Sequence, residues 1–200
     1  MTTVKTQLIN IVLDLETLSL QEDAAILQIG CCIPQFDRVK IPEGISHEFE
    51  VTVAYDIAVK SEFHKDSETM DWWEKQDPRV RKLVFSGQNN YEDALHQLVF
   101  WLDNLRLAGA DIAIWGNGSD FDNRLLTYTL NCYGFKKCWD FRNNRDLRTL
   151  KALFPLEGAG ITLVRTSAEI AHTALGDARY EARVLDITRS VCRNSGIIIL

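Results

Sequence analysis

The chain has 200 residues, of which 46% are hydrophobic and 25% charged, and a net charge of −6, a composition typical of a globular domain with its own core. The negative charge argues against tight, non-specific binding of a polyanion through a broadly basic surface, although an enzyme could still hold a phosphodiester with metal ions. No apolar run is long enough to span a membrane, and the first seven residues lack the apolar core of a signal peptide. We therefore expect a single domain over residues 1–200, without membrane association.

Apolar runs near the amino terminus predict three strands, with short connections that suggest an antiparallel meander, over residues 6–14, 24–33 and 46–53. Helical patterns follow, over residues 65–85, where Pro78 divides the pattern in two, and over residues 90–107. The remaining predicted elements are a strand over 110–118 that runs into a glycine-rich turn, and helices over 120–134, 145–154 and 177–194. This order of elements predicts the α/β class.

The five cysteines form an odd number without the spacing of a disulfide framework. Two of them, Cys31 and Cys32, lie within an apolar, strand-like run. This pattern favours buried free thiols and hence a reducing, cytoplasmic location.

Two acidic residues, Asp14 and Glu16, interrupt the first predicted strand. Because strand side chains alternate, both carboxylates point to the same face. They repel each other there, and burial adds a desolvation cost that a hard cation such as Mg²⁺ would offset. The alternative is an edge strand with solvated acids, but the apolar run over residues 9–13 is typical of a central strand and favours a metal site.

Further acids follow the strand over 110–118. Asp120 and Asp122 come after its glycine turn, and ligands commonly bind beyond the carboxyl ends of strands in α/β folds. Each of the two could instead cap the following helix. Both therefore remain candidate metal ligands.

The last predicted helix begins with Asp177, and His172 lies five residues before it. On one continuous helix the two side chains would point roughly 140° apart. With His172 in a loop that ends near Gly176, both can reach one site. Histidine is suited to accepting a proton near neutral pH, although Asp177 could simply interact with the helix dipole.

These motifs, in their order along the chain, resemble those of the DEDDh exonucleases, which are related to polymerase proofreading domains and ribonuclease T. The stretches LDLETL, DWWEKQDPR, WGNGSDFDN, NNRDLRTL and AHTALGDARYEA are similar to the 3′–5′ exoribonuclease family of the Rv2179c type, and exonuclease A of T-even phages is similar in the same places. The resemblance covers about residues 8–192. It implies an RNase H-like fold, with a mixed central β-sheet, three leading antiparallel strands and flanking α-helices.

The resemblance also implies a site with two Mg²⁺ or Mn²⁺ ions. It assigns the role of general base to His172 and the roles of catalytic metal ligands to Asp14, Glu16, Asp122 and Asp177. The second motif departs from the common proofreading form, in which an asparagine lies four residues before the aspartate. Here Asn117 lies five residues before Asp122. Asp122 is nevertheless favoured over Asp120, because it directly follows Phe121 as the motif requires.

Thr17 and Leu18 resemble the residues with which the family contacts the terminal nucleotide. Asn117 is a further candidate for substrate binding. Trp72 and Trp73 diverge by about 100° on a helix, so one can pack in the core while the other lines a cleft. We assign the substrate contact to Trp73, since aromatic rings stack on bases without reading sequence.

A basic run over residues 142–151 places cations three residues apart, at Arg142, Arg145, Arg148 and Lys151. On the helix predicted over 145–154, part of this run forms a basic stripe. A solvated helix face is the alternative. Next to a metal site we favour phosphate binding by Arg145 and Arg148.

We therefore expect a metal-dependent 3′–5′ exonuclease that releases nucleoside 5′-monophosphates from single-stranded RNA or DNA, or from a 3′ overhang. One alternative is an oligonucleotide or nucleotide phosphodiesterase that uses the same site. Another is a nucleic-acid-binding module that has lost its activity, which the complete set of acids and the histidine disfavours. The apolar tail over residues 196–200 is expected to dock on the domain or on a partner subunit in a homodimer.

Overall fold

Five strands form one mixed sheet in the order β3-β2-β1-β4-β5 in the computed structural model, which describes residues 7–41 and 43–197. The strands are β1 (Gln7–Thr17), β2 (Ile26–Cys32), β3 (Glu48–Thr52), β4 (Ala110–Gly116) and β5 (Asn144–Asp146). The first three are antiparallel neighbours, as predicted, while β1, β4 and β5 run parallel. The predicted α/β class with a mixed sheet is confirmed.

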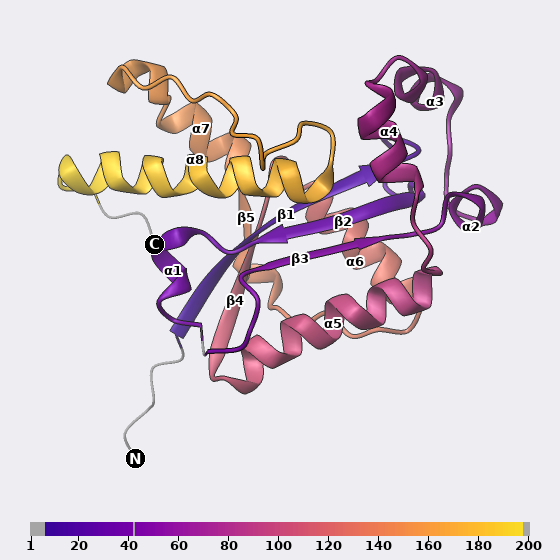
Figure 1. Cartoon of the computed structure of the whole chain (residues 1–200). Helices are drawn as coiled ribbons and strands as arrows, with labels where there is room; N and C mark the ends of the chain where they lie inside the picture. The colour runs from indigo at the N-terminus through magenta and orange to yellow at the C-terminus, as the bar shows by residue number, and fades with distance from the viewer. Residues whose placement is uncertain (1–6, 42, 198–200) are drawn as a thin grey trace.

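Helices cover both faces of this sheet (Figure 1). They are α1 (Gln35–Arg38), α2 (Tyr55–Lys60), α3 (Ser67–Glu74), α4 (Pro78–Phe85), α5 (Tyr91–Leu107), α6 (Asp122–Cys132), α7 (Leu147–Leu153) and α8 (Ala174–Asn194), with 3₁₀ turns at Phe141–Asn143 and Leu156–Ala159. Pro78 begins α4 after an Asp77 cap, which confirms the predicted division. None of the helices within the described residues has the length and apolar character that crossing a bilayer requires.

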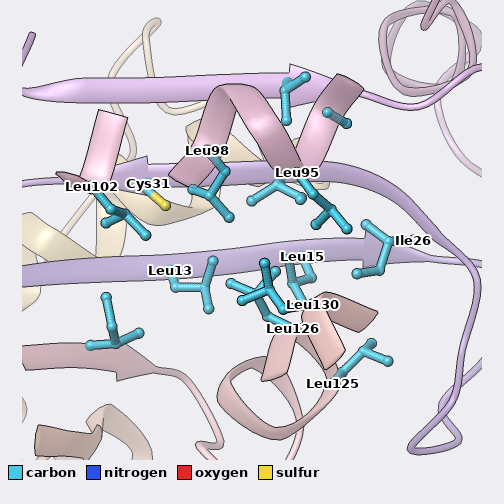
Figure 2. Packing of buried hydrophobic residues seen from close by; sticks show 14 of the residues in the cluster. Leu13, Leu15, Ile26, Cys31, Leu95, Leu98, Leu102, Leu125, Leu126 and Leu130 are labelled. Atoms are coloured by element: carbon cyan, nitrogen blue, oxygen red, sulfur yellow. The ribbon is translucent and has the colours of Figure 1, made fainter. Parts of the chain in front are cut away.

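Side chains along β1 point alternately to the two faces of the sheet, so the strand contributes to a separate core on each face. Leu13 and Leu15 point toward α5 and α6, where Figure 2 shows them among leucines of both helices. Val12 packs on the opposite face against residues of α7 and α8. Asp14 and Glu16 share the parity of Val12, so they point toward the face that α8 covers.

Three details differ from the sequence-based prediction. The helix predicted over 145–154 begins only at Leu147, because residues 144–146 pair in parallel with Ile114–Gly116 at the edge of the sheet. The last helix begins at Ala174, three residues before Asp177. The short helices α1 and α2 were not predicted, and each spans two turns or fewer.

All five cysteines are free thiols, and four of them are buried. Burial raises the pKa of Cys32 to about 11, which keeps this thiol protonated and unreactive near neutral pH. Of the carboxy-terminal tail, residues 198–200 lie outside the described part of the chain, and Ile197 donates its backbone N–H to Cys192 O.

Candidate active site

Three carboxylates meet on the α8 face of the sheet. Oxygen atoms of Asp14, Glu16 and Asp177 all lie within 4.8 Å of one another. The first two reach the site because they share a face of β1, and the third comes from the first turn of α8. Hard carboxylate oxygens grouped in this way are the donors that Mg²⁺ and Mn²⁺ prefer, so the residues fit the divalent ions that the sequence predicts.

Two residues of β2 allow the start of α8 to pack close to these carboxylates. Gly30 pairs with Asp14 across the strands, and a Cβ atom on Gly30 would lie only 2.2 Å from the backbone carbon of Ala174. Gln28 accepts a hydrogen bond from the backbone N–H of Ala174 at 2.8 Å, which satisfies one of the free amides at the start of the helix. A glycine and a polar side chain therefore let the start of α8 lie directly against the sheet.

Asp122 supplies a fourth carboxylate from the first turn of α6. It is 4% exposed and raises the pKa of Asp14 and of Glu16 through its charge. The preceding Gly116 makes room, since a Cβ atom there would lie 3.1 Å from Asp122 Oδ2. Asp120, by contrast, is exposed to solvent. The structure thus places Asp122, and not Asp120, in the acidic cluster.

Burial and the charges of nearby acids raise the pKa of both carboxylates on β1. Burial, followed by the charges of Asp177 and Asp122, raises the pKa of Glu16 to about 8. Burial and the neighbouring acids also raise the pKa of Asp14 well above its usual range. Burial raises the pKa of Asp122 to about 7, although backbone N–H groups of Leu15 and Asn117 stabilise its charged form. A bound divalent cation would remove this repulsion.

His172 lies in the loop before α8 with a φ of 59°, a left-handed conformation that non-glycine residues rarely adopt. Its backbone N–H donates to Asp177 Oδ2 at 2.8 Å, which holds the loop beside the cluster. Gly176 lets this loop pack closely against the first turn of α8, because a Cβ atom on Gly176 would lie 2.1 Å from Ile170 O. The His172 ring stands edge-on to Trp72, with centroids 5.0 Å apart.

A cavity of about 670 Å³ adjoins Glu16, a size suited to a small ligand. Its lining comes from β1, from the loop after it, from α3 and from the residues just before α3 and α6, and includes Thr17, Leu20, His64, Asp66, Trp72 and Phe121. Trp73 also borders this cavity, but it is only 1% exposed and donates its indole N–H to Thr17 O at 2.9 Å.

Two predicted substrate contacts are therefore placed differently from the expectation. Trp72 is 40% exposed, so the ring free to stack on a base is Trp72, while Trp73 supports the backbone after Glu16. The Leu18 side chain is fully buried, and the exposed leucine that lines the cavity is Leu20. Sequence alone could not decide between Trp72 and Trp73, because which of them faces the core depends on how α3 packs.

Only part of the basic run shares a helix face, as predicted: Arg148 and Lys151 lie three residues apart on α7, whereas Arg142 lies in a 3₁₀ turn and Arg145 on β5. Arg148, on α7, donates to Asn117 O at 2.9 Å, and Lys151 donates to Asn117 Oδ1 at 2.6 Å. Both cations thus hold the glycine turn that precedes Asp122. Arg145 lies on β5 and donates to the backbone oxygens of Arg142 and Asn144.

Sequence reasoning missed two charged residues at the site. Glu181 lies one helical turn after Asp177 and is 5% exposed; its four-residue spacing from Asp177 was a signal that could have found it. Arg165 forms an ion pair with Asp177 and stacks over the Tyr180 ring at 4.3 Å. No sequence pattern marked Arg165, since it comes from an irregular loop.

An RNase H-like sheet that gathers carboxylates from β1, α6 and α8, with a histidine just before α8, defines the DEDDh class of exonucleases. The solved nuclease domain of 3′hExo, a DEDDh family member bound to rAMP, has a similar fold, with a TM-score of 0.62 and 13% sequence identity over 96% of this chain and 94% of that one. Among curated proteins, none matches the chain.

The particular family follows from the sequence itself. Residues 9–188 match the Rv2179c-like 3′–5′ exoribonuclease domain, so the chain belongs to this family. Together with the fold, this membership makes the chain a 3′–5′ exonuclease of the DEDDh superfamily.

Proposed function

We propose that this exonuclease is metal-dependent and removes nucleoside 5′-monophosphates from the 3′ end of single-stranded RNA. The observation that carries the proposal is the meeting of carboxylate oxygens from Asp14, Glu16 and Asp177 within 4.8 Å, beside a nucleotide-sized cavity. The exoribonuclease family and the rAMP bound to the structural relative support RNA as the substrate. The free thiols fit a reducing cytoplasm.

Two divalent ions, Mg²⁺ or Mn²⁺, would be held by Asp14, Glu16, Asp122 and Asp177. Such a pair supplies the chemistry of phosphodiester hydrolysis by activating the attacking water and stabilising the leaving 3′ oxygen. His172 accepts the proton that this water loses. The 5′ phosphate stays on the released nucleotide, and the shortened chain keeps a new 3′ hydroxyl group.

The chain's other residues bind and orient the substrate. The terminal nucleoside lies in the cavity next to Thr17, where the exposed Trp72 ring stacks on its base. Arg148 donates to the oxygen of Asn117 in the turn before Asp122. In the complex it also contacts a phosphate of the RNA backbone. These contacts do not depend on base identity, so we expect degradation of any single-stranded sequence.

A panel of labelled oligonucleotides tests the proposal. RNA and DNA strands of equal sequence, each free or blocked at one end, are digested with Mg²⁺, with Mn²⁺ or with EDTA. We expect metal-dependent release of 5′-monophosphates from RNA that a 3′ block stops and a 5′ block does not. Full activity in EDTA would refute the metal site, internal cutting of a circular substrate would refute the exonuclease, and faster digestion of DNA would refute the RNA preference.

A further inference from the structure

One acid of the site has no role in the four-carboxylate arrangement. Glu181 lies on α8 about one turn after Asp177 and is 5% exposed. Its Oε2 atom is buried and has no hydrogen-bond partner among the described residues. A carboxylate oxygen buried in this way is costly unless something satisfies it.

The groups around Glu181 are those of the metal site. Asp122 and Asp177 raise its pKa through their charge, and Glu181 in turn raises the pKa of Asp14. Two cations, Lys151 and Arg165, act on the pKa of Glu181 in the opposite direction. Its place one turn along α8 from Asp177 puts Glu181 next to the cluster.

Neither nearby cation satisfies the free oxygen. Lys151 donates its hydrogen bond to Asn117 Oδ1 at 2.6 Å. Arg165 pairs with Asp177 and donates from its other amino group to Glu169 O. The partner that Oε2 requires is thus missing from the protein's own described groups.

A purely structural position on this part of α8 would carry an apolar residue. Its neighbours Ala178, Ala182 and Leu185 do so and pack against the sheet in the smaller core. Glu181 has no such packing role, and burial raises its pKa to about 8. In the folded chain it adds repulsion to a cluster that is already crowded with acids.

We propose that Glu181 is a positioning residue of the metal centre, whose free oxygen accepts a hydrogen bond from the hydration shell of a cation held by the four ligands. Its negative charge also raises the affinity for that cation. This inference rests on the proposed metal-dependent function. It explains why an acid with an unpaired oxygen is kept in the interior beside Asp14 and Asp177.

The test is a calorimetric titration of Mn²⁺ into the full chain without substrate, for the wild type and for Glu181→Gln. The variant keeps the shape of the side chain but removes its charge. We expect its Mn²⁺ affinity to fall by about 10–100-fold, as for other residues that support metal ligands. Glu92→Gln, which removes an exposed acid from α5 on the opposite face of the sheet, should bind Mn²⁺ like the wild type.

Thermal melting separates this role from a structural one. Without metal, Glu181→Gln should melt at the wild-type temperature or above, because it relieves repulsion, and its stabilisation by Mn²⁺ should be smaller. Should Glu181→Gln fail to fold, Glu181→Asp takes its place, and its Mn²⁺ affinity should fall as well.

The outcomes distinguish this inference from the function on which it rests. A wild-type chain that binds no Mn²⁺ overturns both. A wild type that binds Mn²⁺, together with a Glu181 variant that binds it equally well, overturns only the role of Glu181. A variant with lower metal-free stability and an undiminished response to Mn²⁺ also overturns that role, because Glu181 is then structural.

Discussion

The two faces of β1 differ sharply in what they bury. Toward α5 and α6, Leu13 and Leu15 join a large, continuous apolar core. Toward α8, Val12 joins a much smaller apolar cluster, and the next positions on that face are Asp14 and Glu16. One side of the same strand thus stabilises the fold while the other holds repelling carboxylates.

The difference suggests a division of labour across the sheet. Apolar burial contributes on the order of 25 cal/mol per Å², so the α5 and α6 face can offset the cost of burying several acids on the other. Substitutions on the α5 and α6 face should therefore lower stability, and substitutions of the carboxylates on the α8 face should lower activity.

The largest effect is expected from the metal ligands. Asp14→Asn should lower kcat by about 10³-fold or more, because several kcal/mol of transition-state stabilisation are lost. The metal-free variant should be at least as stable as the wild type, since it loses a repelling charge. Steady-state turnover and thermal melting in EDTA measure the two quantities.

Asp120→Asn is the matched control, because this acid is close in sequence to Asp122 but exposed. It should keep wild-type turnover, whereas Asp122→Asn should lose it. The reverse result would show that the ligand is Asp120 and that the acidic cluster is wrongly assigned.

The next effect concerns the proton acceptor. His172→Gln should lower the single-turnover rate by about 10²–10⁴-fold, the usual contribution of a general base, and leave Mn²⁺ affinity unchanged. Wild-type single-turnover rates in the variant would make the histidine structural.

On the opposite face, Leu98→Ala should lower the free energy of unfolding by about 2–5 kcal/mol, because it leaves a cavity in the large core. Leu98 is fully buried on α5. Urea denaturation measures the loss, and turnover at a temperature where the variant stays folded should be unchanged. Leu107→Ala, on the same helix but 85% exposed, should change stability little. A loss of turnover in the folded Leu98 variant would break the proposed division between the faces.

The pH dependence of stability follows from the acidic face. In the metal-free chain the pKa of Glu16 is raised from 4.5 to about 8 and that of Asp122 from 3.8 to about 7. The folded state therefore holds protons that the unfolded chain has released, so stability is lost as the pH rises through this window. We expect the melting temperature in EDTA to fall by several degrees between about pH 5 and pH 8.

Saturating Mg²⁺ should flatten this fall, because the bound cation replaces the protons. Acids whose pKa is lowered in the folded chain, such as Glu169 beside Arg183, stabilise the fold at neutral pH. This stabilisation is lost only at pH values below the range of about pH 5 to 8. A melting temperature that rises with pH in EDTA would contradict the burial of repelling carboxylates.

The smallest effect is expected at the basic residues. Arg148→Ala should weaken RNA binding a few-fold and reduce the dependence of log affinity on log salt concentration by about one phosphate contact. Arg145→Ala, at the sheet edge, tests the second predicted phosphate contact in the same way. Unchanged salt dependence in both variants would mean that these cations only hold backbone oxygens, as Arg145 does toward Arg142 and Asn144.

Local periodicity was enough to predict the parts of the site that depend on it. Alternation placed Asp14 and Glu16 on one face of β1, and the glycine turn placed Asp122 after β4, as the structure shows. The three leading strands and the long helices were predictable for the same reason, since each repeats an apolar pattern over many residues. Order along the chain then identified the family that residues 9–188 match.

Other features of the site have no periodic signal in the sequence and depend on tertiary packing alone. Strand β5 exists because its three residues pair with β4, a contact too short to leave a periodic signal. Trp72 rather than Trp73 is exposed because of how α3 packs over β1. Glu181 is buried next to the acidic cluster because Gly30 lets α8 lie against the sheet. In each case the deciding energy is long-range packing, which local sequence does not encode.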